Sequence, residues 1–234
     1  MKLKKIMHTD VYTLNQTQTI KEAIHLMEMQ AIRHIPIINS ANHVIGIVSD
    51  RDIRDIRPST LTSDYDENLF LEPISIIMST PVLTGHEDDD VQESARLFYQ
   101  NRIGCLPIIK DGKLTGIITE SDMLYSMTKL LGADRPSSVI EVCVKNKTGM
   151  LADVSAIFKK SQVNIVSAVA YSSEKQGHHM LSFRVQTIDP RRVIRALQNE
   201  GYDVYGPAST PKEGNYDWKS GIDLWCRRTP IQIP

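Results

Sequence analysis

Two stretches share one short pattern, Gly46-Ile47-Val48-Ser49-Asp50-Arg51-Asp52 and Gly116-Ile117-Ile118-Thr119-Glu120-Ser121-Asp122, and they lie seventy positions apart. Each has a glycine, two β-branched apolar residues, a hydroxyl side chain, two variable residues and an aspartate. The pattern predicts a buried strand that ends at the hydroxyl and turns into a helix whose first turn carries the carboxylate.

A hydroxyl and a carboxylate at this spacing have two interpretations. In the first, Ser49 and Thr119 cap the helices, and Asp52 and Asp122 are the acids of a capping box. In the second, the N–H groups of the helix N-terminus favour a phosphate, while each aspartate accepts hydrogen bonds from a vicinal diol. One copy alone favours capping, but repetition within a longer duplicated unit raises the weight of ligand binding.

The composition is that of a folded protein with ordinary charge. The 234 residues are 41% hydrophobic and 24% charged, which allows packed cores in one to three domains. A net charge of −1 argues against a general nucleic-acid binder. Cys105, Cys143 and Cys226 form no C-x-x-C pair, and no apolar leader or membrane-length segment is present. We therefore expect a cytoplasmic protein in a reducing compartment.

The first half of the chain is an internal duplication. Each copy predicts a strand, a helix, a strand, a hairpin, a strand and a helix. A copy of about fifty residues buries too little alone, so two copies are expected to pack through their sheets with pseudo-twofold symmetry. A T/D-x-x-E capping box is expected to open the first helix of each copy. The matching segments are Ile6-Met7 with Ile77-Met78, Thr19–Glu22 with Asp90–Glu93, and Ile35–Ile38 with Leu106–Ile109.

The second half has a different element order. Strands are expected over residues 139–144, 163–171, 178–187 and 202–205, with helices over 150–160 and from Asp189-Pro190 to Gly201. Leu181, Phe183 and Val185 are expected to point inward. The order βαββαβ is the ferredoxin-like split motif. The predicted fold class is therefore mixed α+β and α/β.

The paired units resemble tandem CBS domains, the Bateman module. The matching features are Met78-Ser79-Thr80-Pro81-Val82, the two proline-containing strands and the two repeated motifs. Members of that family usually bind adenine nucleotides in clefts between the two units. The resemblance therefore implies AMP, ADP or ATP as a regulatory ligand, and it leaves S-adenosylmethionine and NAD open.

The same resemblance implies roles for individual residues. Asp52 and Asp122 would hold ribose hydroxyls, with Ser49 and Thr119 near ribose or phosphate. Arg51 would meet the phosphate, and its counterpart is Ser121, so unequal sites are expected. Apolar and main-chain groups would enclose the adenine; these belong to Ile35, Pro36, Ile37, Leu106, Pro107 and Ile108, with the expected strands Thr9–Val11 and Thr80–Val82.

The second half resembles an ACT domain, a regulatory module that often binds amino acids between paired copies. The matching features are the turn Asn146-Lys147-Thr148-Gly149-Met150-Leu151 and Val163-Asn164-Ile165. The usual turn has Asp where Asn146 stands and Pro where Thr148 stands. A ligand at Asn146, Thr148, Gly149, Met150 and Leu151 therefore competes with the interpretation that this domain mainly dimerises.

The expected domain boundaries follow from the two resemblances. The first CBS domain takes residues 1–57, a connecting segment 58–75, and the second CBS domain 76–130. A linker covers 131–138, the ACT domain 139–206 and a C-terminal tail 207–234. The tail carries Trp218 and Trp225 and lacks periodicity.

Catalysis is not expected from this sequence. None of the seven histidines has a metal-ligand spacing, and neither a Walker loop nor G-x-G-x-x-G is present. The acidic run Glu87–Asp90 is expected to start a helix rather than to bind a cation. We predict no catalytic residues, no metal site and no catalytic cofactor.

A tandem CBS pair followed by one ACT domain resembles the acetoin-utilisation protein B family. The expected function is a non-catalytic regulator that binds adenine nucleotides and passes the signal through its ACT domain or a partner enzyme. The resemblance implies a role in acetoin catabolism or carbon utilisation. A homodimer through CBS or ACT surfaces is expected. The alternatives are a nucleotide-acting enzyme, a transcriptional regulator and a homo-oligomeric scaffold with vestigial sites.

Overall fold

A computed structural model describes residues 1–56 and 67–206 of the chain. The chain divides into two compact units, Met1–Met127 and Thr128–Pro234, and each unit has its own sheets and helices. The fold class is mixed α and β, as predicted.

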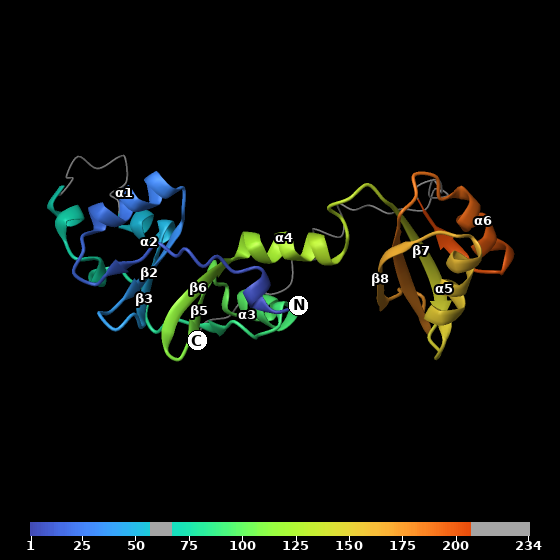
Figure 1. Cartoon of the computed structure of the whole chain (residues 1–234), viewed down its shortest axis with the longest axis horizontal. Helices are drawn as coiled ribbons and strands as arrows, with labels where there is room; N and C mark the ends of the chain where they lie inside the picture. Colours follow the sequence, from blue (N-terminus) through green and yellow to red (C-terminus); the bar gives the residue numbers. More distant parts are fainter. Residues whose placement is uncertain (57–66, 207–234) are drawn as a thin grey trace, which may run out of the picture. The chain divides into compact units, whose positions relative to one another are not determined.

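The first repeat consists of a small sheet and two helices on one side of it (Figure 1). Strand β2 is central, because β1 pairs with it in parallel and β3 pairs with it antiparallel. The elements are β1 (Leu14–Asn15), α1 (Ile20–Gln30), β2 (His34–Ile38), β3 (Val44–Ser49) and α2 (Asp50–Asp55).

The second repeat has the same element order and the same pairing. Its sheet has the order β4-β5-β6, and its irregularity between Ile108 and Ile109 matches the one between Ile37 and Ile38. The duplication expected from the sequence is therefore present down to the strand register. The elements are β4 (Gly85–His86), α3 (Val91–Asn101), β5 (Cys105–Lys110), β6 (Lys113–Thr119) and α4 (Glu120–Leu130).

The expected strands Thr9–Val11 and Thr80–Val82 are not strands, and this prediction was wrong. The short strands lie later, at Leu14–Asn15 and Gly85–His86. The residues just before the expected strands, His8 and Ser79, form isolated bridges with a strand of the opposite repeat. After each bridge the chain passes from the opposite repeat to its own repeat. Thr9–Val11 and Thr80–Val82 lie in this passage, so they do not form continuous hydrogen bonds with one neighbouring strand.

The segment that precedes each repeat completes the core of the other repeat. The 3-10 turn Leu3–Lys5 packs into the second repeat, where the Leu3 N–H donates to Asp89 O at 3.0 Å. The turn Ile74–Ile76 packs into the first repeat, where the Ile74 N–H donates to Gln18 O at 2.7 Å. The tandem unit is therefore held together by exchanged segments.

The acidic run before α3 binds this exchanged segment through ion pairs. The Asp88 and Asp90 carboxylates lie 2.8 and 3.0 Å from the ammonium groups of Lys4 and Lys2. Glu87 pairs with Lys110 at 2.6 Å. Among residues 1–56 and 67–206, no group of three or more His, Cys, Asp or Glu side chains could hold a metal ion.

The capping box expected at the start of α3 is absent. Asp90 is the N-cap residue, but its side chain makes no capping hydrogen bond. Its carboxylate is held by Lys2 and by the chain N-terminus, while Glu93 pairs with Arg96 at 3.1 Å. The prediction failed because both acids have cationic partners that compete with the backbone.

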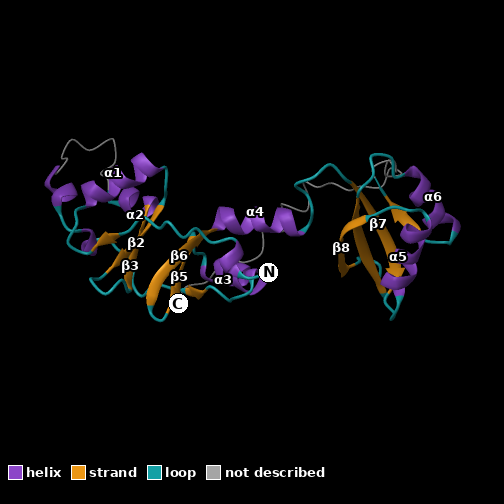
Figure 2. Cartoon of the chain, in the orientation of Figure 1, coloured by secondary structure: helices purple, strands orange, loops and turns teal. Residues whose placement is uncertain are grey.

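The second unit is a four-stranded antiparallel sheet with the order β10-β7-β9-β8. Figure 2 shows α5 and α6 on one face of this sheet. The elements are β7 (Ser138–Lys145), α5 (Met150–Lys160), β8 (Ile165–Ser172), β9 (His178–Val185), α6 (Arg191–Asn199) and β10 (Asp203–Tyr205). The order βαββαβ confirms the ferredoxin-like prediction.

The core of the second unit lies between the sheet and these helices. Leu181, Phe183 and Val185 are buried, as predicted, and the rings of Phe158 and Phe183 lie 4.7 Å apart between their centroids. Helix α6 begins one residue later than expected. The N-cap residue is therefore Pro190 and not Asp189 as expected, although the Asp189 carboxylate accepts from the Arg191 N–H at 3.1 Å.

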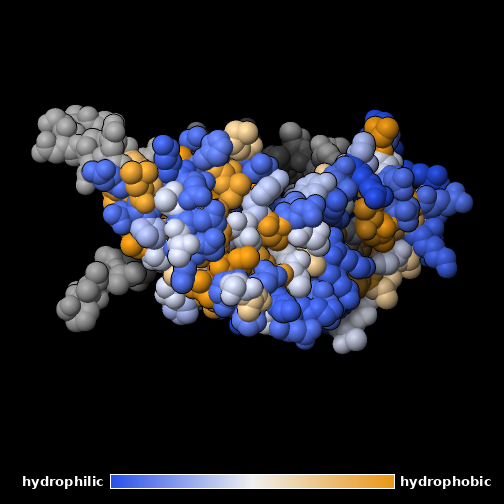
Figure 3. Space-filling model, turned by 60° about the vertical axis from the view of Figure 1, so that its left-hand side comes forward, coloured by the Kyte–Doolittle hydropathy of each residue, from blue (hydrophilic) through white to orange (hydrophobic). Residues whose placement is uncertain are grey.

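The surface shown in Figure 3 mixes hydrophobic with hydrophilic residues. Large exposed side chains include Leu124 and Met29, with 69% and 66% of their surface accessible. Over the ranges 1–56 and 67–206, no helix combines the length and the apolar character needed to cross a membrane.

Candidate functional site

The first repeated motif is a capping box at the junction of β3 and α2. The Ser49 N–H and hydroxyl both donate to Oδ2 of Asp52, each at 2.7 Å. The Asp52 N–H donates back to Ser49 Oγ at 3.3 Å. Locally, the capping interpretation is therefore confirmed.

Two further helices begin with the same arrangement. In the second motif, Thr119 donates its N–H and hydroxyl to Asp122 Oδ2 at 2.8 and 2.7 Å. At the start of α1, Thr19 donates in the same way to Glu22 Oε2 at 2.7 and 2.8 Å. Because Thr19-Glu22 lies outside the repeated motif, the geometry within the box does not by itself mark a ligand site.

The second oxygen of each carboxylate distinguishes the three boxes. Oε1 of Glu22 accepts from Gln18 Nε2 at 3.1 Å, and Oδ1 of Asp122 lies 3.0 Å from His8 Nε2. Within the described residues, Oδ1 of Asp52 has no hydrogen-bond partner. Asp52 therefore offers a half-buried carboxylate oxygen whose twin is already fixed by the helix cap.

The carboxyl of Asp122 has a perturbed pKa. Partial burial raises it, but hydrogen bonds from Thr119 and His8 outweigh burial, so the pKa lies below its ordinary value of 3.8. Asp122 is therefore a carboxylate over the whole neutral range, with 22% of its side chain exposed.

Each motif lies beside the segment that enters from the opposite repeat. Ser79 exchanges backbone hydrogen bonds with Ile47 at 2.8 and 3.1 Å, and His8 does so with Ile117 at 3.0 and 2.9 Å. The segments Thr80–Val82 and Thr9–Val11 follow directly. Their threonines are exposed and their valines half-buried, so these segments present surface at the two motifs.

The residues expected to enclose adenine lie mostly in the cores. Strands β2 and β5 are central in their sheets, and both of their faces are covered. The middle of each strand therefore faces the core, while His34 and Ile38 of β2 and Ile109 and Lys110 of β5 keep accessible surface. Ile35, Ile37, Leu106 and Ile108 are completely buried, and Pro36 and Pro107 are also buried.

Arg51 projects from α2 as an exposed side chain. The described residues hold no ion pair of Arg51, whereas its neighbour Arg54 pairs with Asp50 at 3.0 Å. Ser121, its counterpart in α4, is also exposed. The two motifs therefore differ in surface charge, since the first has an arginine where the second has a serine. That this difference affects phosphate binding stays a prediction.

The structure adds His8 and Ser79 to the residues predicted from sequence. The two residues occupy equivalent positions, since each follows the Ile-Met pair and precedes a threonine. That equivalence was visible in the repeat alignment. The contact between His8 and Asp122 was not, because the residues are separated by 114 positions.

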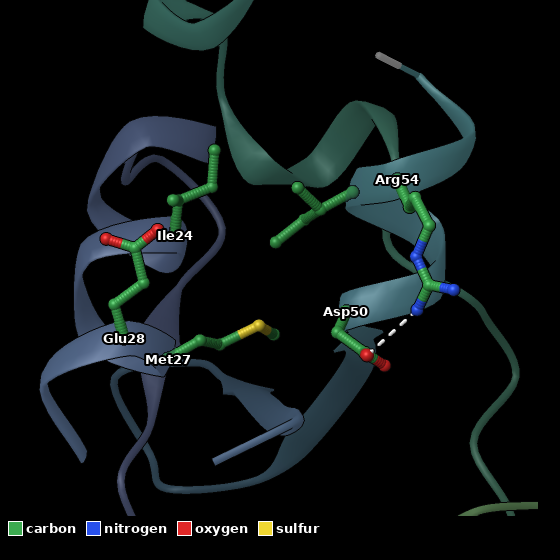
Figure 4. Close-up of a pocket in the computed structure, with 6 residues that line it drawn as sticks. Ile24, Met27, Glu28, Asp50 and Arg54 are labelled. Atoms are coloured by element: carbon green, nitrogen blue, oxygen red, sulfur yellow. Dashed lines mark hydrogen bonds and ion pairs between the residues drawn. The ribbon is translucent and has the colours of Figure 1, made fainter. Parts of the chain in front are cut away.

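A cavity of about 270 Å³ lies between α1 and α2, and its lining includes Asp50 of the first motif but not Asp52. Figure 4 shows Ile24 and Met27 of α1 toward α2, with the Asp50–Arg54 ion pair at its rim. None of the residues predicted to bind a nucleotide lines this cavity.

Two groups with possible chemical reactivity, buried Cys105 and half-buried His34, lie in the central strands of the two repeats. The pKa of the Cys105 thiol is raised to about 12 by burial, so this residue is a poor nucleophile. Burial likewise lowers the pKa of His34, although Asp50 opposes the change. A Cβ atom on Gly104 would meet the His34 ring at 2.9 Å from Cε1, so the two repeats approach closely here.

The turn before α5, where an ACT ligand was expected, is exposed. The Asn146 N–H donates to Gly177 O at 2.8 Å, while no side-chain hydrogen bond of Asn146 or Thr148 occurs within the described residues. Gly149 has φ of 93°, a conformation that favours glycine. Met150 is half-buried and Leu151 is exposed.

Comparison with protein families assigns both halves of the chain. The model of the CBS domain matches residues 3–59 and 74–129. The model of the ACT domain matches residues 138–201.

Similar proteins align with the CBS half. A structure of a putative acetoin utilization protein (AcuB) from Vibrio cholerae is 34% identical, with a TM-score of 0.50, and the match covers 57% of this chain and 96% of that one. The CBS domain-containing protein YhcV of Bacillus subtilis is 31% identical, over 52% of this chain and 81% of its own length. In a longer relative, inosine-5′-monophosphate dehydrogenase of Methanocaldococcus jannaschii, the matching segment is 31% identical and spans only 23% of the enzyme.

Proposed function

We propose that this chain, which belongs to the CBS-domain proteins and carries a tandem CBS pair followed by an ACT domain, is a regulatory protein that binds an adenine nucleotide. One observation carries the proposal. Asp52 holds one carboxylate oxygen in the helix cap and presents the other, Oδ1, without a protein partner in the described residues.

The chemistry of this arrangement suits a ribose. A carboxylate accepts hydrogen bonds from neighbouring hydroxyl groups, and such charge-assisted bonds are stronger than neutral ones. The cap with Ser49 holds the Asp52 carboxylate before any ligand arrives, so little side-chain entropy is lost on binding. Exposed Arg51 supplies a nearby cation for a phosphate group.

The regulatory step requires that the nucleotide bind two conformations with different affinity. We propose that the signal passes from the CBS pair to the ACT domain or to a partner protein. The likeness to the putative acetoin utilization protein supports a role in acetoin catabolism or carbon utilisation.

Calorimetric titration of the full chain with AMP, ADP, ATP and S-adenosylmethionine tests the proposal. Asp52→Asn is the informative variant, because its amide oxygen still accepts from Ser49 while Oδ1 is replaced by a donor. Glu22→Gln is the matched control, since Glu22 has the same capping box outside the repeated motif.

We expect saturable binding by the wild type and by Glu22→Gln, and weaker binding by Asp52→Asn. A folded wild-type protein, free of co-purified ligand, that binds none of the four compounds would reject the nucleotide proposal.

The edge of the ACT sheet favours a second role in assembly. Among the described strands, β8 pairs only with β9, so no described strand pairs with its other edge, and its Val166 and Val169 are 37% and 39% exposed. A homo-oligomeric scaffold would form by pairing this edge with a second copy. Light scattering of wild type and Val169→Pro tests this role, and an unchanged mass would reject it.

A further inference from the structure

The contact between His8 and Asp122 makes the two motif carboxylates unequal. The difference comes from His8, which lies outside both motifs. His8 Nε2 lies 3.0 Å from Asp122 Oδ1, the oxygen that corresponds to the open Oδ1 of Asp52. Thr119 already occupies Oδ2 of Asp122 through two hydrogen bonds. Both oxygens of Asp122 therefore have protein partners.

The backbone holds His8 at this position. His8 exchanges two backbone hydrogen bonds with Ile117, two residues before the motif hydroxyl. The preceding segment is anchored by buried Leu3 and by the ion pairs of Lys2 and Lys4. The imidazole itself is 63% exposed, so its side chain can leave Asp122 without disturbing the core.

The first motif provides the comparison. Ser79 exchanges the same two backbone hydrogen bonds with Ile47, but its short side chain makes no hydrogen bond within the described residues. The two sites thus share the strand, the helix cap and the segment that enters from the opposite repeat. They differ in that His8 contacts the Asp122 carboxylate, whereas Ser79 makes no such contact with Asp52.

We propose that His8 is a specificity-determining residue that occupies the Asp122 carboxylate and makes the second site the weaker one for a ribose diol. This inference rests on the proposed nucleotide function. A diol can reach Asp122 Oδ1 only by displacing the imidazole, whereas no side chain of the described residues holds Asp52 Oδ1.

A pair of reciprocal variants tests the inference in the full chain. His8→Ser is made in the Asp52→Asn background, so that AMP and ATP titrations report the Asp122 site. Ser79→His is made in the Asp122→Asn background, so that the titrations report the Asp52 site. The His8 imidazole is followed by NMR during the AMP titration, since displacement moves its resonance. Thermal unfolding checks that each variant is folded.

We expect His8→Ser to tighten binding about two- to fivefold, as for an exposed charge-assisted pair, and Ser79→His to weaken it by a similar factor. The His8 resonance should shift on nucleotide addition. If wild type binds nucleotide but the variants leave affinity unchanged, or His8→Ser weakens it, the inference is wrong and the nucleotide function stands. If folded wild type binds neither nucleotide and neither does folded His8→Ser in the Asp52→Asn background, the nucleotide function fails, and the inference with it.

Discussion

Leu3 and Ile74 occupy equivalent places in opposite repeats, and each is completely buried in the core of the repeat to which it does not belong by sequence. The backbone N–H of each residue also donates a hydrogen bond to the opposite repeat, from Leu3 to Asp89 O and from Ile74 to Gln18 O. The tandem pair is therefore one cooperative unit, in which the start of the chain is part of the second repeat.

Removing the Leu3 side chain should destabilise the tandem unit. Leu3→Ala is expected to lower the free energy of unfolding by about 2–5 kcal/mol, because it leaves a cavity in a buried cluster. Urea unfolding measures the change, with exposed Leu83→Ala as the control. Equal stabilities for the two variants would contradict the exchanged packing.

Gly116 lies close to the N-terminal segment at the second motif. A Cβ atom there would lie 2.9 Å from Met7 Sδ and 3.0 Å from His8 O. Gly116→Ala is therefore expected to cost about 1–3 kcal/mol of stability through overpacking. A double-mutant cycle with Met7→Ala should recover part of that loss. Strict additivity in the cycle would show that Met7 does not cause the crowding.

The lowered pKa of Asp122 predicts a specific dependence on pH. A carboxyl whose pKa is lower in the folded state stabilises the fold at a pH above its pKa in the unfolded state. This stabilisation is lost as the pH falls through its pKa in the folded state. For Asp122 the loss occurs below pH 3.8. In His8→Ser, ¹³C NMR titration should show the Asp122 pKa raised relative to wild type, because one hydrogen bond is gone. An identical titration in both proteins would contradict the contact.

Cys105 should resist modification while the protein is folded. The residue is 5% exposed, and burial raises the pKa of its thiol to about 12, so both access and the thiolate fraction are low. Peptide mapping after iodoacetamide treatment should find Cys105 labelled only when denaturant is present. Rapid labelling of Cys105 in folded protein would contradict its burial.

The sequence predicted local features better than long-range ones. The motif Gly46–Asp52 contains its own strand, cap and helix start, so its geometry could be predicted from spacing. The exchange of Leu3 could not, because a single buried leucine near the start of a chain has no periodicity to mark its partner. Asp90 shows the opposite failure, where a correct local pattern was overridden by Lys2, eighty-eight positions away.

The candidate site divides in the same way. Ser49 and Asp52 were identified from the repeat, and their mutual hydrogen bonds agree with the capping interpretation. His8 was missed, since its role depends on a tertiary contact. The sequence did not determine the burial of Ile35 and Ile37, because a proline-containing apolar strand can lie at a surface or at the centre of a sheet.

The most direct test of the central claim compares AMP with 2′-deoxy-AMP and 3′-deoxy-AMP on wild type and Asp52→Asn by calorimetry. If Asp52 holds the ribose diol, the wild type should bind the deoxy compounds about tenfold more weakly, and Asp52→Asn should lose most of that discrimination. Glu22→Gln should discriminate as the wild type does. Equal discrimination by wild type and Asp52→Asn would contradict the assignment of Asp52 as the ribose-binding residue.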